Sequence, residues 1–119
     1  LILPTGPHGL RALVDEAFAR ARCTPKVVAE IDGLALLMDA VSAGLGATIQ
    51  PGAATLRLHS DDVALVQISN PHARRPNLLV SLSDDELSPA ALATRVVLTE
   101  VARSLVAEGR WTGASFHES

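Results

Sequence analysis

The sequence predicts an α/β domain in which short strands alternate with helices. Two patterns and the composition predict this class. Short β-branched runs are followed by stretches whose apolar residues recur with the period of a helix, and turns rich in glycine and proline separate them. Hydrophobic residues make up 48% of the 119 residues but aromatic residues only 3%. The core is therefore expected to be aliphatic, and the alternation of elements favours parallel strands covered by helices.

The N-terminal elements follow this alternation. Residues 1–3 form a short apolar strand, and glycine and proline mark 5–9 as a loop. From Leu10 to Ala21 apolar residues fall at helical spacing and predict an amphipathic helix. Residues 26–31 are rich in β-branched side chains and predict a second strand.

The stretch from residue 34 to 51 is the most informative in the chain. Residues 34–43 are apolar nearly all round, which is typical of a helix buried on more than one side. Asp32 is a candidate N-cap for this helix. Gly44 suits the left-handed position that follows a helix. Residues 45–49 then predict a strand, which Pro51 ends.

The C-terminal half predicts two more strands and a long helix. One helical turn is expected at 53–56, strands at 63–68 and 77–82, and a linker at 69–76. Ser88 and Pro89 are an N-cap serine followed by proline at the first helical position. The helix is expected to reach about residue 108. Its expected apolar face is Ala93, Val97, Val101 and Leu105.

Composition excludes several functions. The net charge is −3, and no basic stripe is present that could hold nucleic acid through its phosphates. No apolar run approaches the length that spans a bilayer, so no membrane partner is expected. Cys23 is the only cysteine, which fits the reducing cytoplasm where we expect the protein to reside.

The sequence shows no motif that would carry out catalysis. It lacks a nucleophile elbow, a phosphate-binding loop and a zinc-protease motif, so no catalytic residue is predicted. The histidines lie in predicted loops or the tail, without the spacing of a metal pair on one helix face. They are His8, His59, His72 and His117. No metal and no cofactor is expected, and the protein is predicted not to be an enzyme.

Two predicted loops are candidates for ligand binding. Residues 5–9 and 31–33 each join the carboxyl end of a strand to the start of a helix. In open α/β sheets ligands bind at this edge, where helix N-termini present free N–H groups. The alternative is that both loops are plain connections with ordinary helix capping, and the spacing alone leaves both open.

The ordered set of these segments resembles the second half of the effector-binding domain of LysR-type transcriptional regulators. The resemblance covers nearly the whole chain. Its segments are Leu1-Ile2-Leu3-Pro4, His8-Gly9-Leu10-Arg11, Val28-Ala29-Glu30-Ile31, the helix 34–43, Ala43-Gly44-Leu45-Gly46-Ala47-Thr48-Ile49-Gln50-Pro51, Asn70-Pro71 and Leu87-Ser88-Pro89-Ala90-Ala91.

The resemblance implies an α/β fold like that of type 2 periplasmic binding proteins, in truncated form. Residues 1–69 are expected to be the second effector-binding subdomain. Residues 70–119 are expected to be the return segment, strand and C-terminal helix of the first. Leu1 already stands within an apolar run, so we expect an internal start. The leading strands of the first subdomain and an N-terminal winged helix-turn-helix are then expected upstream.

The resemblance also implies effector contacts in two loops of this chain. They are Thr5 and His8 after the first strand, and Ile31, Asp32 and Gly33 before the buried helix. Asp32 departs from the neutral polar residue that many family members place there. A carboxylate repels an anionic effector. Asp32 is therefore expected either to cap the helix or to bind a neutral or amine-bearing ligand.

The expected function is ligand sensing and oligomerisation within a bacterial LysR-type transcription regulator. The partners implied are a small-molecule effector in the cleft between subdomains, further copies in a dimer or tetramer, and DNA only through the missing winged helix-turn-helix. An unpaired strand 77–82 and a bare helix face would favour self-association. One alternative is the solute-binding domain of a transport system. A small α/β enzyme is the third interpretation, and it requires a nucleophile or metal cluster that the sequence does not show.

Overall fold

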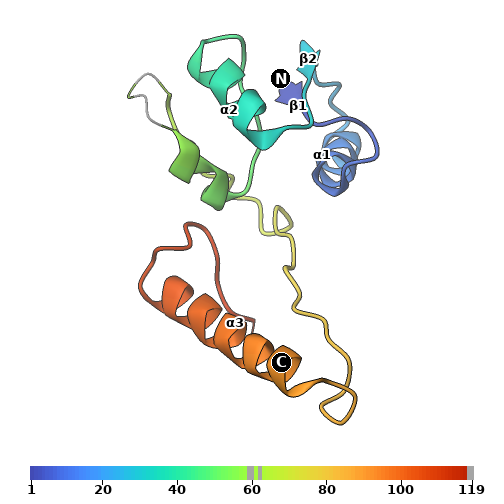
Figure 1. Ribbon diagram of the computed structural model, residues 1–119. Coiled ribbons are helices and arrows are strands. Elements are labelled where there is room, and N and C mark those ends of the chain that lie inside the picture. Colours follow the sequence, from blue (N-terminus) through green and yellow to red (C-terminus); the bar gives the residue numbers. More distant parts are fainter. Residues whose placement is uncertain (59–60, 62, 118–119) are drawn as a thin grey trace. The chain divides into compact units, whose positions relative to one another are not determined.

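The computed structural model of the chain describes residues 1–58, 61 and 63–117. Two compact units divide the chain, Leu1–Ala73 and Arg74–Ser119 (Figure 1). Among these described residues, the first unit holds two strands, two α-helices and a short 3-10 helix, and the second holds one long helix. Each unit has its own internal packing.

The first unit is built on a parallel pair of short strands. β1 (Ile2–Leu3) pairs with β2 (Ala29–Glu30), so that Ile2 lies opposite Ala29 and Leu3 opposite Glu30. The helix α1 (Gly9–Arg20) connects them. The parallel strand–helix–strand unit predicted from the sequence is confirmed, with strands shorter than the expected ranges 1–3 and 26–31.

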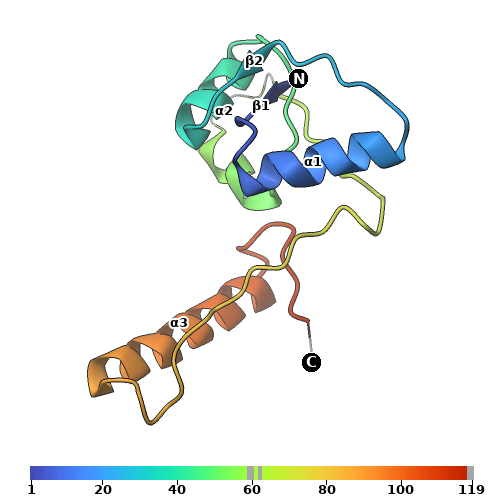
Figure 2. The same cartoon turned by 90° about the vertical axis from the view of Figure 1, so that its right-hand side faces the viewer.

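Helices cover both faces of this strand pair, as Figures 1 and 2 show. Successive side chains of a strand point to opposite faces, and the two residues of β1 follow this rule. Leu3 packs on Leu10 and Val14 of α1. Ile2 packs on the other side, against the helix α2 (Leu34–Ser42) and the 3-10 helix η1 (Gly52–Arg57). The other buried members of the cluster on this side are Leu37, Met38, Ala40 and Ala54.

The turn after α2 and the helical turn near residue 54 were both predicted correctly. Gly44 has a φ of +78°, which is the left-handed conformation that glycine adopts with least strain. η1 covers the range where a helical turn was expected. The predicted strand 45–49 is wrong, because only one ladder bond forms, from Ile2 N–H to Ala47 O at 2.8 Å. The segment therefore lies beside β1 without extending the sheet by a regular strand.

The second unit begins its helix where the sequence predicted. α3 spans Pro89–Ala107, and the Ser88 hydroxyl accepts a hydrogen bond from Ala91 N–H at 3.2 Å. Gly109, with a φ of +68°, follows the helix end. The prediction of this helix, its N-cap and its glycine stop is confirmed.

The predicted strands 63–68 and 77–82 are wrong. Neither stretch is a strand, and the described backbone hydrogen bonds include none from or to either of them. A strand exists only where a neighbour accepts and donates its backbone hydrogen bonds. Large apolar side chains of 77–82 stay exposed instead, with Leu78 at 80% and Val80 at 83%.

The expected dry face of α3 is also wrong in part. Val97 and Val101 were predicted on it, yet they are 56% and 48% exposed. No described residue of α3 is fully buried. Helix amphipathicity stabilises a fold only when another layer covers the apolar face, and the second unit contains no sheet among its described residues.

Candidate functional site

The two predicted loops meet at the carboxyl ends of β1 and β2. Because the strands are parallel, both loops leave the sheet at the same edge. The backbone N–H of Thr5 donates to Asp32 Oδ1 at 2.9 Å. The Thr5 hydroxyl donates to the same carboxylate, at 2.8 Å from Oδ1 and 2.9 Å from Oδ2. The carboxylate thus links the two loops, although they are 27 residues apart in sequence.

Asp32 remains ionised in this arrangement. The hydrogen bond from the Thr5 N–H, followed by that from its hydroxyl, lowers the pKa of Asp32 below its ordinary value. A smaller electrostatic contribution from His8 acts in the same direction. The side chain is exposed, so the loops present a negative charge to solvent.

The expectation that Asp32 caps the following helix is wrong. Gly33 is the N-cap of α2, and no side chain bonds to the first turn of the helix. The Gly33 carbonyl accepts from Leu37 N–H at 2.9 Å. Asp32 points to Thr5 instead because a hydroxyl and an N–H together satisfy it better than one capping bond.

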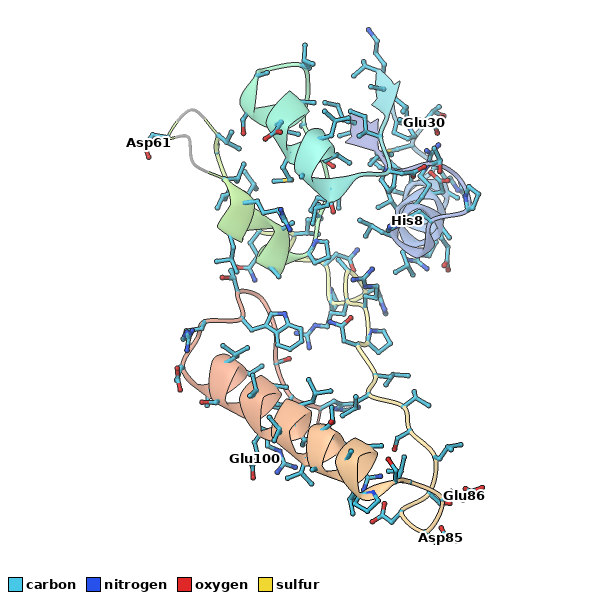
Figure 3. The ribbon with its side chains drawn as sticks, in the orientation of Figure 1. His8, Glu30, Asp61, Asp85, Glu86 and Glu100 are labelled. Atoms are coloured by element: carbon cyan, nitrogen blue, oxygen red, sulfur yellow. The ribbon has the colours of Figure 1, made fainter. Side chains whose placement is uncertain are left out.

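His8 is the residue that caps a helix here. Its Nδ1 accepts a hydrogen bond from Leu10 N–H at 3.2 Å, at the start of α1. Its backbone N–H donates to Thr5 O at 3.1 Å and closes the turn of the first loop. His8 is exposed and lies next to α1 in Figure 3.

Ile31 contributes differently from the other predicted site residues. Its side chain is half-buried and packs against the core beneath α2. Its backbone N–H donates to Leu3 O at 2.9 Å, which ties the second loop to β1. The structure therefore brings Thr5, Asp32 and His8 near one another through polar contacts, whereas Ile31 anchors the loop.

An arginine that the sequence analysis assigned no role holds the first loop and β2 together. Arg11 Nη1 donates to Pro4 O at 2.9 Å and to Glu30, while Nε binds Asp15 at 2.9 Å. The bonds to Glu30 and then to Asp15 raise the pKa of Arg11 above its ordinary value. An arginine in the first turn of a helix that follows a strand was the available signal, since it can reach the carboxylate of a neighbouring strand.

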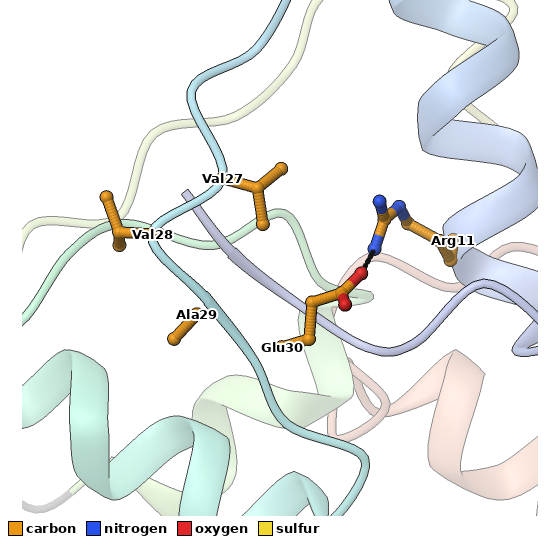
Figure 4. Close-up of a pocket in the computed structure, with 5 residues that line it drawn as sticks. All are labelled: Arg11, Val27, Val28, Ala29 and Glu30. Atoms are coloured by element: carbon orange, nitrogen blue, oxygen red, sulfur yellow. Dashed lines mark hydrogen bonds and ion pairs between the residues drawn. The ribbon is translucent and has the colours of Figure 1, made fainter.

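A shallow open depression lies along β2, as Figure 4 shows. Its lining is Arg11, Val27, Val28, Ala29 and Glu30. The two charged side chains are paired with each other, so the charged groups of this depression are already matched. The Thr5–Asp32 loops present an exposed carboxylate and are the stronger candidate site.

In the part of the chain that the structure describes, no group of three or more histidine, cysteine or acidic side chains is placed to hold a metal ion. His72 and His117 are exposed, and His59 lies outside the described residues. Within the same residues, no helix is both long and apolar enough to cross a bilayer.

Comparison with known proteins gives one family. The family model described as the LysR substrate binding domain matches residues 1–103. The nitrogen assimilation regulatory protein nac of Escherichia coli K12 is 34% identical over 115 residues, which cover 92% of this chain and 36% of that protein. The protein of the same name from Klebsiella aerogenes is 32% identical over 99 residues, covering 82% of this chain and 32% of that protein.

A third relative carries a more general name. The uncharacterized HTH-type transcriptional regulator YfeR of Shigella flexneri is 34% identical over 107 residues, covering 90% of this chain and 34% of that protein. The chain thus spans about a third of the length of the curated relatives it matches. No solved structure matches the chain significantly. The family match over residues 1–103, on an α/β arrangement of helices and parallel strands, shows that the chain belongs to the LysR substrate-binding domain family.

Proposed function

We propose that this chain is the ligand-sensing part of a LysR-type transcription regulator and that its ligand binds at the loops 5–9 and 31–33. The family match over residues 1–103 carries the regulator proposal. The bond network between Thr5 and Asp32 supports the location, because it places exposed polar groups at the edge of the sheet where α/β proteins bind ligands.

The proposed mechanism is a population shift without chemistry. A ligand that contacts both loops stabilises the arrangement of the regulator's domains in which the two loops can bind it together. It can shift the balance only by the difference in its affinity for the arrangements. The Asp32–Thr5 link supports this role, since it joins the two loops by hydrogen bonds.

DNA binding is proposed to reside outside this chain. The relatives are about three times as long as the chain, and one is named an HTH-type transcriptional regulator. The net charge of −3 offers the chain itself little attraction to phosphates. Residues 70–119 are proposed to belong to the other effector subdomain.

Self-association is part of the same proposal. Exposed apolar side chains cluster on α3 and on the segment 77–82, including Leu78, Val80 and Val97. An unpaired extended segment and an uncovered helix face favour contact with another chain. The proposed assembly is a dimer or tetramer, and light scattering across a concentration series measures it. A strictly monomeric result at high concentration contradicts it.

The sensing proposal is tested in cells without knowing the ligand. Strains carry the regulator as wild type, as Asp32→Asn, or as Asp39→Asn, which removes an equal charge from the exposed face of α2. Genome-wide promoter occupancy and transcript levels are then measured across several growth media.

The proposal expects all three proteins to occupy promoters. Transcription should vary with the medium in wild type and Asp39→Asn but much less in Asp32→Asn. An absence of promoter occupancy contradicts the regulator proposal. A medium response of Asp32→Asn equal to that of wild type contradicts the assignment of these loops.

A further inference from the structure

The hydrogen-bond directions at the two loops restrict what can bind there. The Thr5 hydroxyl has a single hydrogen, and that hydrogen is donated to Asp32. The Thr5 backbone N–H is donated to the same carboxylate. Both donors of Thr5 are therefore used within the protein. Its hydroxyl oxygen can still accept a hydrogen bond from a ligand.

Asp32 extends this acceptor surface and charges it. A carboxylate has about four lone-pair positions, and here two donors from a single residue occupy part of them. The ion pairs formed by the described residues involve Asp15, Glu16, Glu30, Asp84 and Glu108 as the anions, and not Asp32. The nearby cation Arg11 is bound to Asp15, Glu30 and Pro4 O.

His8 supplies a donor at the same place. Its Nδ1 accepts from Leu10 N–H, so the neutral ring carries its hydrogen on Nε2. The loops thus combine a charged acceptor at Thr5–Asp32 with one donor at His8.

From these directions we infer that the ligand presents an N–H donor, and by preference an ammonium group, to the Asp32–Thr5 pair. This inference rests on the proposed sensing function and names the ligand class for the same site. A ligand carboxylate placed here would meet the like charge of Asp32 and the acceptor oxygens of Asp32 and Thr5. A ligand ammonium would instead form charge-assisted hydrogen bonds with these oxygens.

Matched four-carbon probes test the inference on the 119-residue chain. The probes are 1,4-diaminobutane, 1,4-butanediol and succinate at equal ionic strength. The measurement follows the NMR amide shifts of Thr5, Asp32 and Gly33 during titration. Wild type is compared with Asp32→Asn, which keeps an acceptor oxygen for Thr5, and with Asp39→Asn, which removes an equal charge elsewhere on the first unit.

The expected result is a response to the diamine that is confined to residues 5–8 and 31–33. Asp32→Asn should weaken this binding by about tenfold, the factor expected for one lost charge-assisted hydrogen bond, while Asp39→Asn leaves it unchanged. Diamine shifts of equal size at the exposed acidic run 84–86 (Figure 3) show general ion attraction and overturn the inference.

A response of the loops to succinate and not to the diamine overturns the ligand class but keeps the sensing site. The same holds for a response to the diol alone. No response at these loops to any of the three probes overturns the inference, and the promoter measurement then decides the sensing proposal separately.

Discussion

The two units of this chain differ in how far they bury their apolar side chains. The fully buried apolar residues of the described chain all lie in the first unit, among them Ile2, Leu3 and Leu37. The second unit is also rich in leucine and valine, but its helix has no fully buried residue. Burial depends on a second layer as much as on composition. The first unit contains both a strand pair and the helices that cover it. The second unit contains a long helix but, among its described residues, no sheet for that helix to cover.

This difference matters for function because a sensing site needs rigid support. The loops 5–9 and 31–33 leave a strand pair whose two faces are both covered. The exposed apolar side chains of the second unit suit contact with further protein instead. The comparison predicts that substitutions in the first unit reduce stability strongly, whereas similar substitutions in the second unit have small effects.

The largest expected effect comes from shortening a core leucine. Leu37 is 1% exposed, so Leu37→Ala should lower the free energy of unfolding by about 2–5 kcal/mol. Leu98 of α3 is 50% exposed, so Leu98→Ala should cost only about 1 kcal/mol or less. Urea denaturation followed by circular dichroism compares the two. Equal losses would show that the units are similarly packed.

A glycine next to β1 should give the next largest effect. A Cβ added at Gly46 would lie 3.2 Å from Ile2 Cγ1 and 3.4 Å from Val28 Cγ2. Gly46→Ala is therefore expected to cost about 1–3 kcal/mol through overpacking. Gly9→Ala is the control, since an added Cβ meets nothing within 4 Å and the residue begins α1. It should be neutral or slightly stabilising, and a loss as large as that of Gly46→Ala contradicts the close approach.

Helix caps provide a comparison of like features in the two units. Ser88→Ala removes the N-cap of α3 and should cost about 1 kcal/mol. Asn is a strong N-cap and can accept the same bond as His8, so His8→Asn should retain the stability of α1 while His8→Ala lowers it. Thermal unfolding measures all three variants. Equal stability of His8→Asn and His8→Ala would exclude a capping role for this side chain.

The smallest expected effect is a pH dependence that belongs to the first unit. The folded state lowers the pKa of Asp32, so its stabilising contribution is complete above the ordinary aspartate value of about 3.9 and is lost as the pH falls through the lowered value. Wild type should therefore lose stability below about pH 4 more steeply than Asp32→Asn. Denaturation at a series of acidic pH values measures the difference, with Asp39→Asn expected to follow wild type.

Helices in this chain could be predicted well from sequence, and strands less well. Ser88, Pro89 and Gly109 mark the ends of α3 by local chemistry alone. A strand depends on a partner elsewhere in the chain. The runs 26–31 and 77–82 look alike as sequences, but only the first contains a strand, because β1 is available to pair with it.

The candidate site was predictable in position but not in bonding. Loops after parallel strands meet at one edge, which is why Thr5 and Asp32 come together. The sequence allowed Asp32 either to cap α2 or to face a ligand. It did not show that Asp32 would instead bond to the N–H and hydroxyl of Thr5. No sequence signal marked the His8 cap, because histidine is not among the preferred N-cap residues. The contacts of Arg11 with Pro4 O and Glu30 depend on how α1 lies against the strands, which no local pattern contains.

The central claim is that this chain belongs to a DNA-binding regulator and senses a ligand for it. Sequencing the DNA upstream of the codon for Leu1 tests this claim most directly. The account predicts a winged helix-turn-helix and a linker helix, followed by the leading strands of the first effector subdomain. A secretory signal there, or an α/β half that carries catalytic groups, would contradict the account.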